Sequence, residues 1–139
     1  MSKLSWDEYY MNIADAVSTK SPDRIKVGSV LISNKDNKIL STGYNSTPKG
    51  VNNANIDFTD RDLIKKIIVH SELNCVIYKN NFEDCTLYVT RSPCEKCVLV
   101  LAAARVNKII YKDEHKDIKE SKKLCQYFDI QLIKYQSSK

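Results

Sequence analysis

Two short motifs constrain this chain more than any other feature: an HSE triplet at residues 70–72 and a PCEKC segment at residues 93–97. The imidazole of His70 and the thiolates of Cys94 and Cys97 are three ligands of the kind that zinc prefers. Three protein ligands leave a fourth position open to water, which is typical of catalytic zinc sites. The motifs therefore predict that the fold brings two separate segments together around Zn²⁺.

Glu72 stands two positions after the histidine and is our candidate for a catalytic proton carrier. Zinc lowers the pKa of a bound water from about 15.7 to roughly 7, so hydroxide becomes available at neutral pH. Attack on an amidine-like ring such as cytosine then needs a carboxylate that protonates the ring nitrogen and the departing ammonia. His70 and Glu72 both face the metal only if they lie in the first turn of a helix.

A closed structural zinc site is the alternative, and it requires a fourth ligand from the protein. The sequence offers four candidates for that ligand: Cys75, Cys85, Cys125 and His115. Free cysteine is usually a small buried residue, so we favour the catalytic arrangement. Glu72 discriminates between the two hypotheses, because a non-catalytic zinc-stabilised interaction module has no need of it.

The length of 139 residues and the hydrophobic content of 42% fit one domain, to which we assign residues 1–139. No apolar run is long enough to cross a bilayer, and the first residues lack the apolar stretch of a secretory signal. The five cysteines lack the density of a disulfide scaffold and are expected to be reduced. The sequence therefore predicts a soluble, cytoplasmic protein with no membrane partner.

The formal net charge of +5 favours an anionic partner, although the lysines are spread among acidic residues. A nucleotide phosphate fits this distribution as well as a nucleic acid does. Arg24, Lys26 and Lys49 are candidate phosphate contacts, and Arg24 is preferred because its planar guanidinium matches phosphate geometry. The four arginines are scattered and form no concentrated groove, which argues against a nucleic-acid partner.

Hydrophobic periodicity predicts alternating strands and helices. Strands are expected at residues 27–33, 39–44, 85–91, 108–111 and 130–135. Helices are expected within residues 60–80, at 94–104 and at 116–128. A further helix is expected near the start of the sequence, where an apolar stripe is formed by Trp6, Tyr10, Ile13, Ala14 and Val17. The stripe is expected to be core. Periodicity does not show whether residues 60–80 form one helix or two. A helical crossover normally joins parallel neighbours, so the last two strands are predicted to be parallel.

At these motifs the chain resembles the cytidine deaminase-like superfamily, whose HAE or HCE and PCxxC motifs it matches with Ser71 in the middle position. Within that superfamily it is most similar to the deoxycytidylate (dCMP) deaminases. The supporting segments run in order through most of the domain: VGSVL at 27–31, GYN at 43–45, PKG at 48–50, HSELN at 70–74, LYVT at 87–90 and PCEKC at 93–97.

The resemblance implies an α/β fold, a three-layer α/β/α sandwich around a five-stranded mixed sheet in the order 2-1-3-4-5. It also implies zinc held between the starts of two helices, one of which begins near His70. The parallel last strands, inferred above from the crossover, agree with this branch of the superfamily.

By resemblance the reaction is zinc-dependent hydrolysis of dCMP to dUMP and ammonia, with dCTP as a further candidate substrate. Asn45 matches a residue that relatives place near the sugar, and His115 falls where they carry a tyrosine near the substrate phosphate. The rival within the superfamily is a tRNA or other nucleic-acid deaminase, which needs a basic surface around its pocket.

Many relatives bind dCTP as activator and dTTP as inhibitor at their GYNGxP region, often within a hexamer. The resemblance therefore implies a homo-oligomer with dCTP and dTTP as candidate effectors. Ser46 replaces the glycine after GYN, and the loop at residues 51–59 is short and lacks cysteine and histidine. These departures leave allosteric control open.

Overall fold

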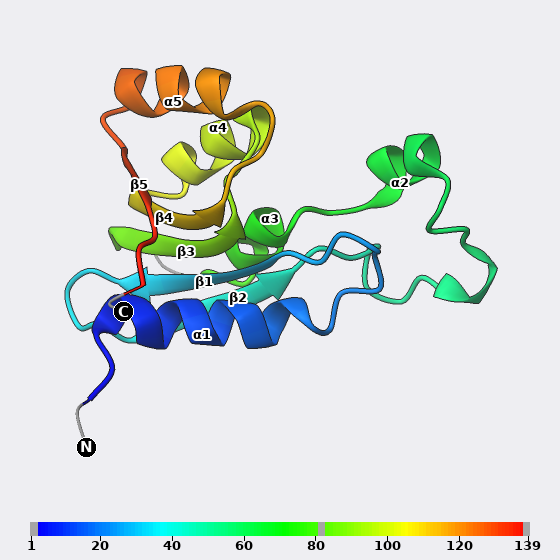
Figure 1. The fold of residues 1–139 in the computed structure, drawn as a ribbon, viewed down its shortest axis with the longest axis horizontal. Helices are drawn as coiled ribbons and strands as arrows, with labels where there is room; N and C mark the ends of the chain where they lie inside the picture. The colour runs from blue at the N-terminus through cyan, green and yellow to red at the C-terminus, as the bar shows by residue number, and fades with distance from the viewer. Residues whose placement is uncertain (1–2, 81–82, 138–139) are drawn as a thin grey trace.

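The computed structural model describes residues 3–80 and 83–137. A five-stranded sheet in the order β2-β1-β3-β4-β5 forms its centre (Figure 1). The strands are β1 (Gly28–Ser33), β2 (Ile39–Tyr44), β3 (Cys85–Arg91), β4 (Val106–Asp113) and β5 (Gln131–Lys134). The helices are α1 (Trp6–Ser18), the 3-10 turn η1 (Asn53–Asn55), α2 (Arg61–Ile67), α3 (Ser71–Ile77), α4 (Glu95–Ala103) and α5 (Ile118–Tyr127).

The sheet is mixed, because β1 runs antiparallel to both β2 and β3 whereas β3, β4 and β5 are parallel. Helix α4 connects β3 to β4, and α5 connects β4 to β5. The predicted fold class, strand order and parallel last strands are therefore confirmed. The fourth strand is longer than the predicted residues 108–111.

The central strands send alternate side chains to opposite faces, which builds two apolar layers. Leu87 and Ile109 pack into a cluster with buried residues of α3, α4 and α5. Tyr88 and Ile110 point the other way and pack against α1. Figure 1 shows the resulting sandwich, with α1 on one side of the sheet and α3, α4 and α5 on the other. None of the helices in the described residues is long and apolar enough to cross a membrane.

The predicted apolar stripe of the first helix is only partly core. Tyr10 and Ala14 are buried, but Trp6 is 59% exposed, so its assignment to the core was wrong. Trp6 is the first residue of α1, and its ring stacks on that of Tyr10 at 5.5 Å between centroids instead of entering the sheet layer. Met11, which the predicted stripe did not include, is buried.

The helical stretch at residues 60–80 is two helices with an extended break between them. Ile68 has extended backbone angles, and Val69 forms an antiparallel bridge with Ser46. Both backbone hydrogen bonds of that bridge are made, at 2.7 and 3.1 Å. Helix α3 consequently starts afresh at Ser71, in agreement with the implied helix start near His70.

Two strand glycines allow helices to approach the sheet closely. A Cβ atom on Gly43 would lie 2.5 Å from the carbonyl oxygen of Ser71, and one on Gly28 would lie 2.0 Å from that of Ala14. No side chain fits at such distances, so both positions need glycine. Gly43 thereby lets the start of α3 rest directly on β2.

Candidate active site

His70 and Cys94 occupy equivalent positions at the starts of two different helices. His70 is the N-cap residue of α3 and Cys94 is the N-cap residue of α4. Neither side chain makes an N-cap hydrogen bond, although N-cap side chains commonly do so. Both side chains instead turn toward one another, and Cys97 joins them from the first turn of α4.

The three predicted ligand atoms form a compact triangle. His70 Nδ1 lies 3.1 Å from Cys97 Sγ and 3.6 Å from Cys94 Sγ, and the two sulfur atoms are 3.4 Å apart. Zinc bonds of about 2.3 Å to sulfur and 2.0 Å to nitrogen place tetrahedral ligand atoms roughly 3.5 to 3.8 Å apart. The triangle is slightly tighter than this, and its donor set and size fit Zn²⁺.

The electrostatics of the cluster favour a bound cation. Hydrogen bonds from Cys97 and His70 lower the pKa of the Cys94 thiol to about 3. The bond with Cys94 also raises the pKa of Cys97, together with burial and the nearby Glu72 carboxylate. The hydrogen bond to Cys94 raises the pKa of His70 against the opposing effect of burial. Metal binding displaces such shared protons from the ligands.

No fourth protein ligand joins the cluster within residues 3–80 and 83–137. The side chains of Cys75, Cys85 and Cys125 are all part of the apolar core around β3. Burial raises the pKa of each of these thiols, so they are neutral at physiological pH. The closed structural site is therefore not supported among the described residues.

Glu72 lies in the first turn of α3 with only 4% of its surface exposed. Its Oε1 accepts a hydrogen bond from Ser71 Oγ at 2.7 Å, and its negative charge is near enough to help raise the pKa of Cys97. A buried carboxylate beside the metal cluster is well placed to move protons. Glu72 itself is no part of the ligand triangle.

A cavity of about 390 Å³ opens beside the cluster. Its wall includes His70, Glu72 and Cys94, together with side chains from the segment before β1 and from α2. Cationic side chains gather in this lining, namely Arg61, Lys65, Arg91 and Lys116. The cavity therefore combines a metal cluster, a buried carboxylate and positive charge in a space suited to a small anionic molecule.

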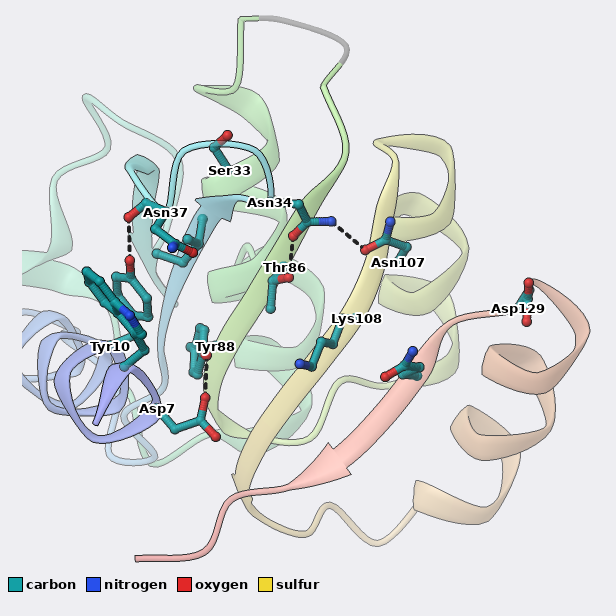
Figure 2. Close-up of a pocket in the computed structure, with 13 residues that line it drawn as sticks. Asp7, Tyr10, Ser33, Asn34, Asn37, Thr86, Tyr88, Asn107, Lys108 and Asp129 are labelled. Atoms are coloured by element: carbon teal, nitrogen blue, oxygen red, sulfur yellow. Dashed lines mark hydrogen bonds between the residues drawn. The ribbon is translucent and has the colours of Figure 1, made fainter. Parts of the chain in front are cut away.

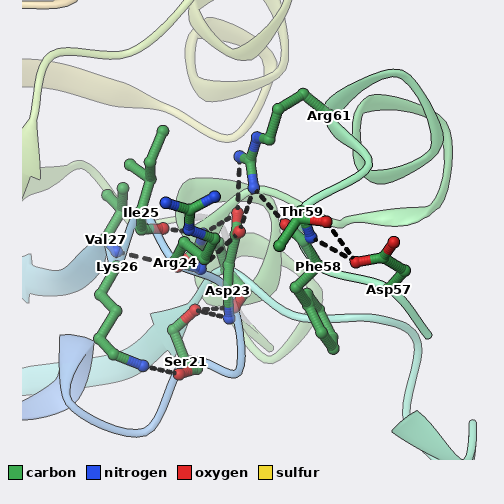
Figure 3. Close-up of polar contacts among 11 residues, drawn as sticks. Ser21, Asp23, Arg24, Ile25, Lys26, Val27, Asp57, Phe58, Thr59 and Arg61 are labelled. Atoms are coloured by element: carbon green, nitrogen blue, oxygen red, sulfur yellow. Dashed lines mark hydrogen bonds and ion pairs between the residues drawn. The ribbon is translucent and has the colours of Figure 1, made fainter. Parts of the chain in front are cut away.

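Asn45 lines this cavity as part of a buried hydrogen-bond network, whose Asp23 and Arg61 side chains are shown in Figure 3. Its Oδ1 accepts from the Val27 amide at 2.8 Å, and its Nδ2 donates to the Ile25 carbonyl at 2.7 Å and to Asp23 Oδ2 at 3.3 Å. Arg61 donates from both terminal nitrogens to the Asp23 carboxylate, at 2.7 and 3.3 Å. The network fixes α2 to the segment before β1 across the cavity.

Asp23 is buried at 4% exposure and remains ionised because of this pairing. Burial alone raises the pKa of Asp23, but the hydrogen bonds from Arg61 and the Arg24 amide outweigh it and lower the pKa. Sequence reasoning missed the pair, since its partners are 38 residues apart and share no motif.

Of the remaining residues predicted to contact the substrate, the structure places one in the cavity lining and the others outside it. His115 lines the cavity, where burial and the neighbouring Arg91 lower its pKa. Arg24 is exposed and is not among the lining residues, and Lys49 instead lines a separate cavity of about 410 Å³ beside β2. Arg91, which the sequence shows only as one of four scattered arginines, lies at the end of β3 and does line the cavity.

A further cavity of about 630 Å³ lies on the α1 face of the sheet (Figure 2). Several of its polar groups are paired with one another, as in the 2.5 Å hydrogen bond from Tyr88 to Asp7 and the 2.6 Å bond from Thr86 to Asn34. The metal-ligand cluster is not part of its lining. The chemistry of the molecule is therefore concentrated on the α3 and α4 side of the sheet.

The α/β/α sandwich, the His-Cys-Cys triangle between two helix starts and the buried glutamate beside it define the class of zinc-dependent hydrolytic deaminases. A family model for the cytidine and deoxycytidylate deaminase zinc-binding region matches residues 4–113. The chain therefore belongs to this family, and it is a zinc enzyme.

Individual relatives agree with this assignment. The deoxycytidylate deaminase of Mycobacterium phage D29 is 32% identical over 129 residues, which cover 82% of this chain and 99% of the relative. The human deoxycytidylate deaminase is 29% identical over 127 residues, or 85% of this chain and 71% of the relative. The apo crystal structure of dCMP deaminase from the cyanophage S-TIM5 superposes with a TM-score of 0.77 at 27% identity, covering 96% of this chain and all of that one.

Proposed function

We propose that the chain converts dCMP and water into dUMP and ammonia, as a hydrolase of deoxynucleotide metabolism. The observation that carries this proposal is one cavity whose lining combines the ligands His70 and Cys94 and the Glu72 carboxylate with cationic side chains. The relatives from phage D29 and human are both deoxycytidylate deaminases, which supports a cytosine nucleotide as the substrate.

In this mechanism His70, Cys94 and Cys97 hold the metal, and Glu72 handles the protons. Zinc, when bound, acts as a Lewis acid that makes water nucleophilic near neutral pH. The Glu72 carboxylate takes the two protons of the attacking water in turn, and it delivers one to the ring nitrogen and the other to the leaving amino group. The water oxygen replaces the exocyclic nitrogen on the ring, and that nitrogen leaves as ammonia.

The substrate phosphate is assigned to the cationic part of the cavity lining. Arg91 and His115 are neighbours there, since the charge of Arg91 helps to lower the pKa of His115. No hydrogen bond or ion pair within the described residues occupies the Arg91 guanidinium, whereas Arg61 is committed to Asp23. A planar guanidinium binds phosphate in a bidentate manner, so Arg91 is preferred over the exposed Arg24. Asn45 is part of the cavity lining and helps to give the cavity wall its shape.

Ammonia release from cytidine, deoxycytidine, dCMP and dCTP tests the proposal directly. We expect dCMP to give the highest kcat/KM with the zinc-loaded protein. Turnover of a tRNA anticodon stem-loop alone would replace the proposal with the nucleic-acid deaminase. Absence of turnover on every substrate would favour a zinc-stabilised interaction module.

Assembly, regulation and location are further parts of the proposal. A homo-oligomer is proposed, with dCTP and dTTP as effectors at the separate cavity of about 410 Å³, where Lys20 and Lys49 supply positive charge. The five free cysteines of the described residues support a reducing, cytoplasmic location. The single sheet with its two apolar layers supports one domain over residues 1–139. Light scattering with and without each nucleotide tests assembly and regulation together.

A further inference from the structure

Two buried serine hydroxyls form a series of hydrogen bonds that ends at the Glu72 carboxylate. Ser71 Oγ donates to Glu72 Oε1 at 2.7 Å, and Ser29 Oγ lies 2.6 Å from Ser71 Oγ. Both serines have no exposed surface. A hydroxyl has a single proton to donate, and that of Ser71 is directed at Glu72. Ser29 must therefore donate to Ser71, and the series of hydrogen bonds runs from β1 through the start of α3 to the carboxylate.

The backbone holds the two serine hydroxyls in place. Ser29 and Gly43 are paired residues of β1 and β2, and the start of α3 lies directly over them. Gly43 permits this approach because it has no side chain. The carboxylate is thus held by the Ser71 hydroxyl, which is itself tied to the sheet through Ser29.

We propose that Ser71 is a positioning residue for the deamination, which it serves by holding the Glu72 carboxylate in its reactive orientation, and that Ser29 acts through Ser71. The inference rests on the proposed function, since Glu72 is the proton carrier there. A carboxylate that must take and deliver protons within one turnover works only at hydrogen-bond distance from the reacting atoms. Free rotation of its side chain lowers the fraction of molecules in that geometry.

Steady-state kinetics of the zinc-loaded variants test the assignment. We expect Ser71→Ala to lower kcat about tenfold while the KM for dCMP changes less than about twofold, because orientation rather than binding is lost. Ser29→Ala is expected to lower kcat about threefold, since Ser71 keeps its bond to Glu72 but loses its own donor. In the double variant kcat should equal that of Ser71→Ala, because Ser29 has no other route to Glu72.

Ser41→Ala is the matched control. Ser41 Oγ also ties β2 to α3, through a 2.8 Å hydrogen bond to the Cys75 carbonyl, but it does not touch the carboxylate. If Ser71 has only a structural role, Ser71→Ala and Ser41→Ala should lose similar stability, and both should keep the kcat of the wild type. The positioning role predicts full zinc content in both variants and a kcat loss in Ser71→Ala only.

A crystal structure of zinc-loaded Ser71→Ala separates this inference from the proposed function. We expect Glu72 to occupy a second rotamer there, whatever substrate the wild-type enzyme uses. An unchanged single rotamer overturns the assignment, as does a kcat for Ser71→Ala within about twofold of a wild type that turns over dCMP. Additive losses in the double variant overturn the role of Ser29. Failure of the wild type on dCMP counts against the proposed function alone.

Discussion

His70 Nδ1 and Cys94 Sγ lie 3.6 Å apart although 24 residues separate them, because each residue begins a different helix on the same side of the sheet. The N-terminal ends of both helices carry partial positive charge, which favours thiolate ligands there. The metal site is therefore a junction between α3 and α4, and its occupancy is coupled to the packing of these helices.

Loss of a ligand is expected to reduce zinc content and stability together. His70→Ala or Cys94→Ala removes one of three protein ligands, and zinc binding is linked to folding. Cys125→Ala is the control, because Cys125 is a buried core cysteine outside the cluster. Elemental analysis should show zinc in the control and little in the ligand variants. Normal occupancy in His70→Ala would show that the ligands are wrongly assigned.

Removal of the Glu72 carboxylate is expected to abolish turnover and leave the metal in place. Glu72→Gln keeps the shape of the side chain but cannot cycle protons, so kcat should fall by about 10³-fold. Zinc content and the thermal unfolding midpoint should stay close to those of the wild type. Retained activity in this variant would refute the proton-transfer mechanism.

Arg91 is expected to recognise the phosphate rather than the base. Arg91→Gln should raise the KM for dCMP about 10- to 100-fold, the range for losing hydrogen bonds to a charged group. Deoxycytidine has no phosphate, so its KM should not change. Arg24→Gln is the matched comparison, since Arg24 is exposed and lies outside the lining. A larger effect at Arg24 would restore the assignment made from sequence.

The Asp23–Arg61 pair is expected to stabilise the fold in a pH-dependent way. Arg61→Gln leaves a buried carboxylate without its charged partner, at a cost of about 1–3 kcal/mol in the free energy of unfolding. Urea titrations at pH 7 measure this loss. Arg105→Gln is the control and should cost less than about 0.5 kcal/mol, because its ion pair with Asp84 is exposed.

The same pair predicts how the loss changes with pH. The pKa of Asp23 in the folded protein lies below the ordinary 3.8, so the pairing contributes its full stability above about pH 4. That contribution disappears as the pH falls through the lowered pKa. The stability gap between wild type and Arg61→Gln should be constant from about pH 5 to 8 and should narrow toward pH 3. A gap that widens in acid contradicts the assigned ion pair.

Local patterns in the sequence predicted the strands well, because alternating apolar residues report directly on a two-sided sheet. The second strand begins and ends at the predicted residues 39 and 44, and the third at 85 and 91. The break before His70 was not predictable in this way, since apolar residues continue through it. It depends on the bridge between Val69 and Ser46, a contact across 23 positions.

Contacts between distant segments were beyond the sequence for the same reason. The ligand motifs could be identified because zinc chemistry restricts residue types and spacing. The pairing of Asp23 with Arg61 and of Ser29 with Ser71 follows only from tertiary packing. The preference for Arg24 rested on the planar shape of its guanidinium, which does not show whether the side chain lines a cavity.

Gly43 contributes no functional group, yet the distance between the catalytic helix and the sheet depends on its bare backbone. Steric clearance at an edge strand is thus a requirement of the chemistry, as much as the ligands themselves. A design that transfers the two motifs to another scaffold therefore also needs a residue without a side chain at this contact between strand and helix. A side chain at this position would collide with the backbone of α3, the helix whose start carries His70 and Glu72.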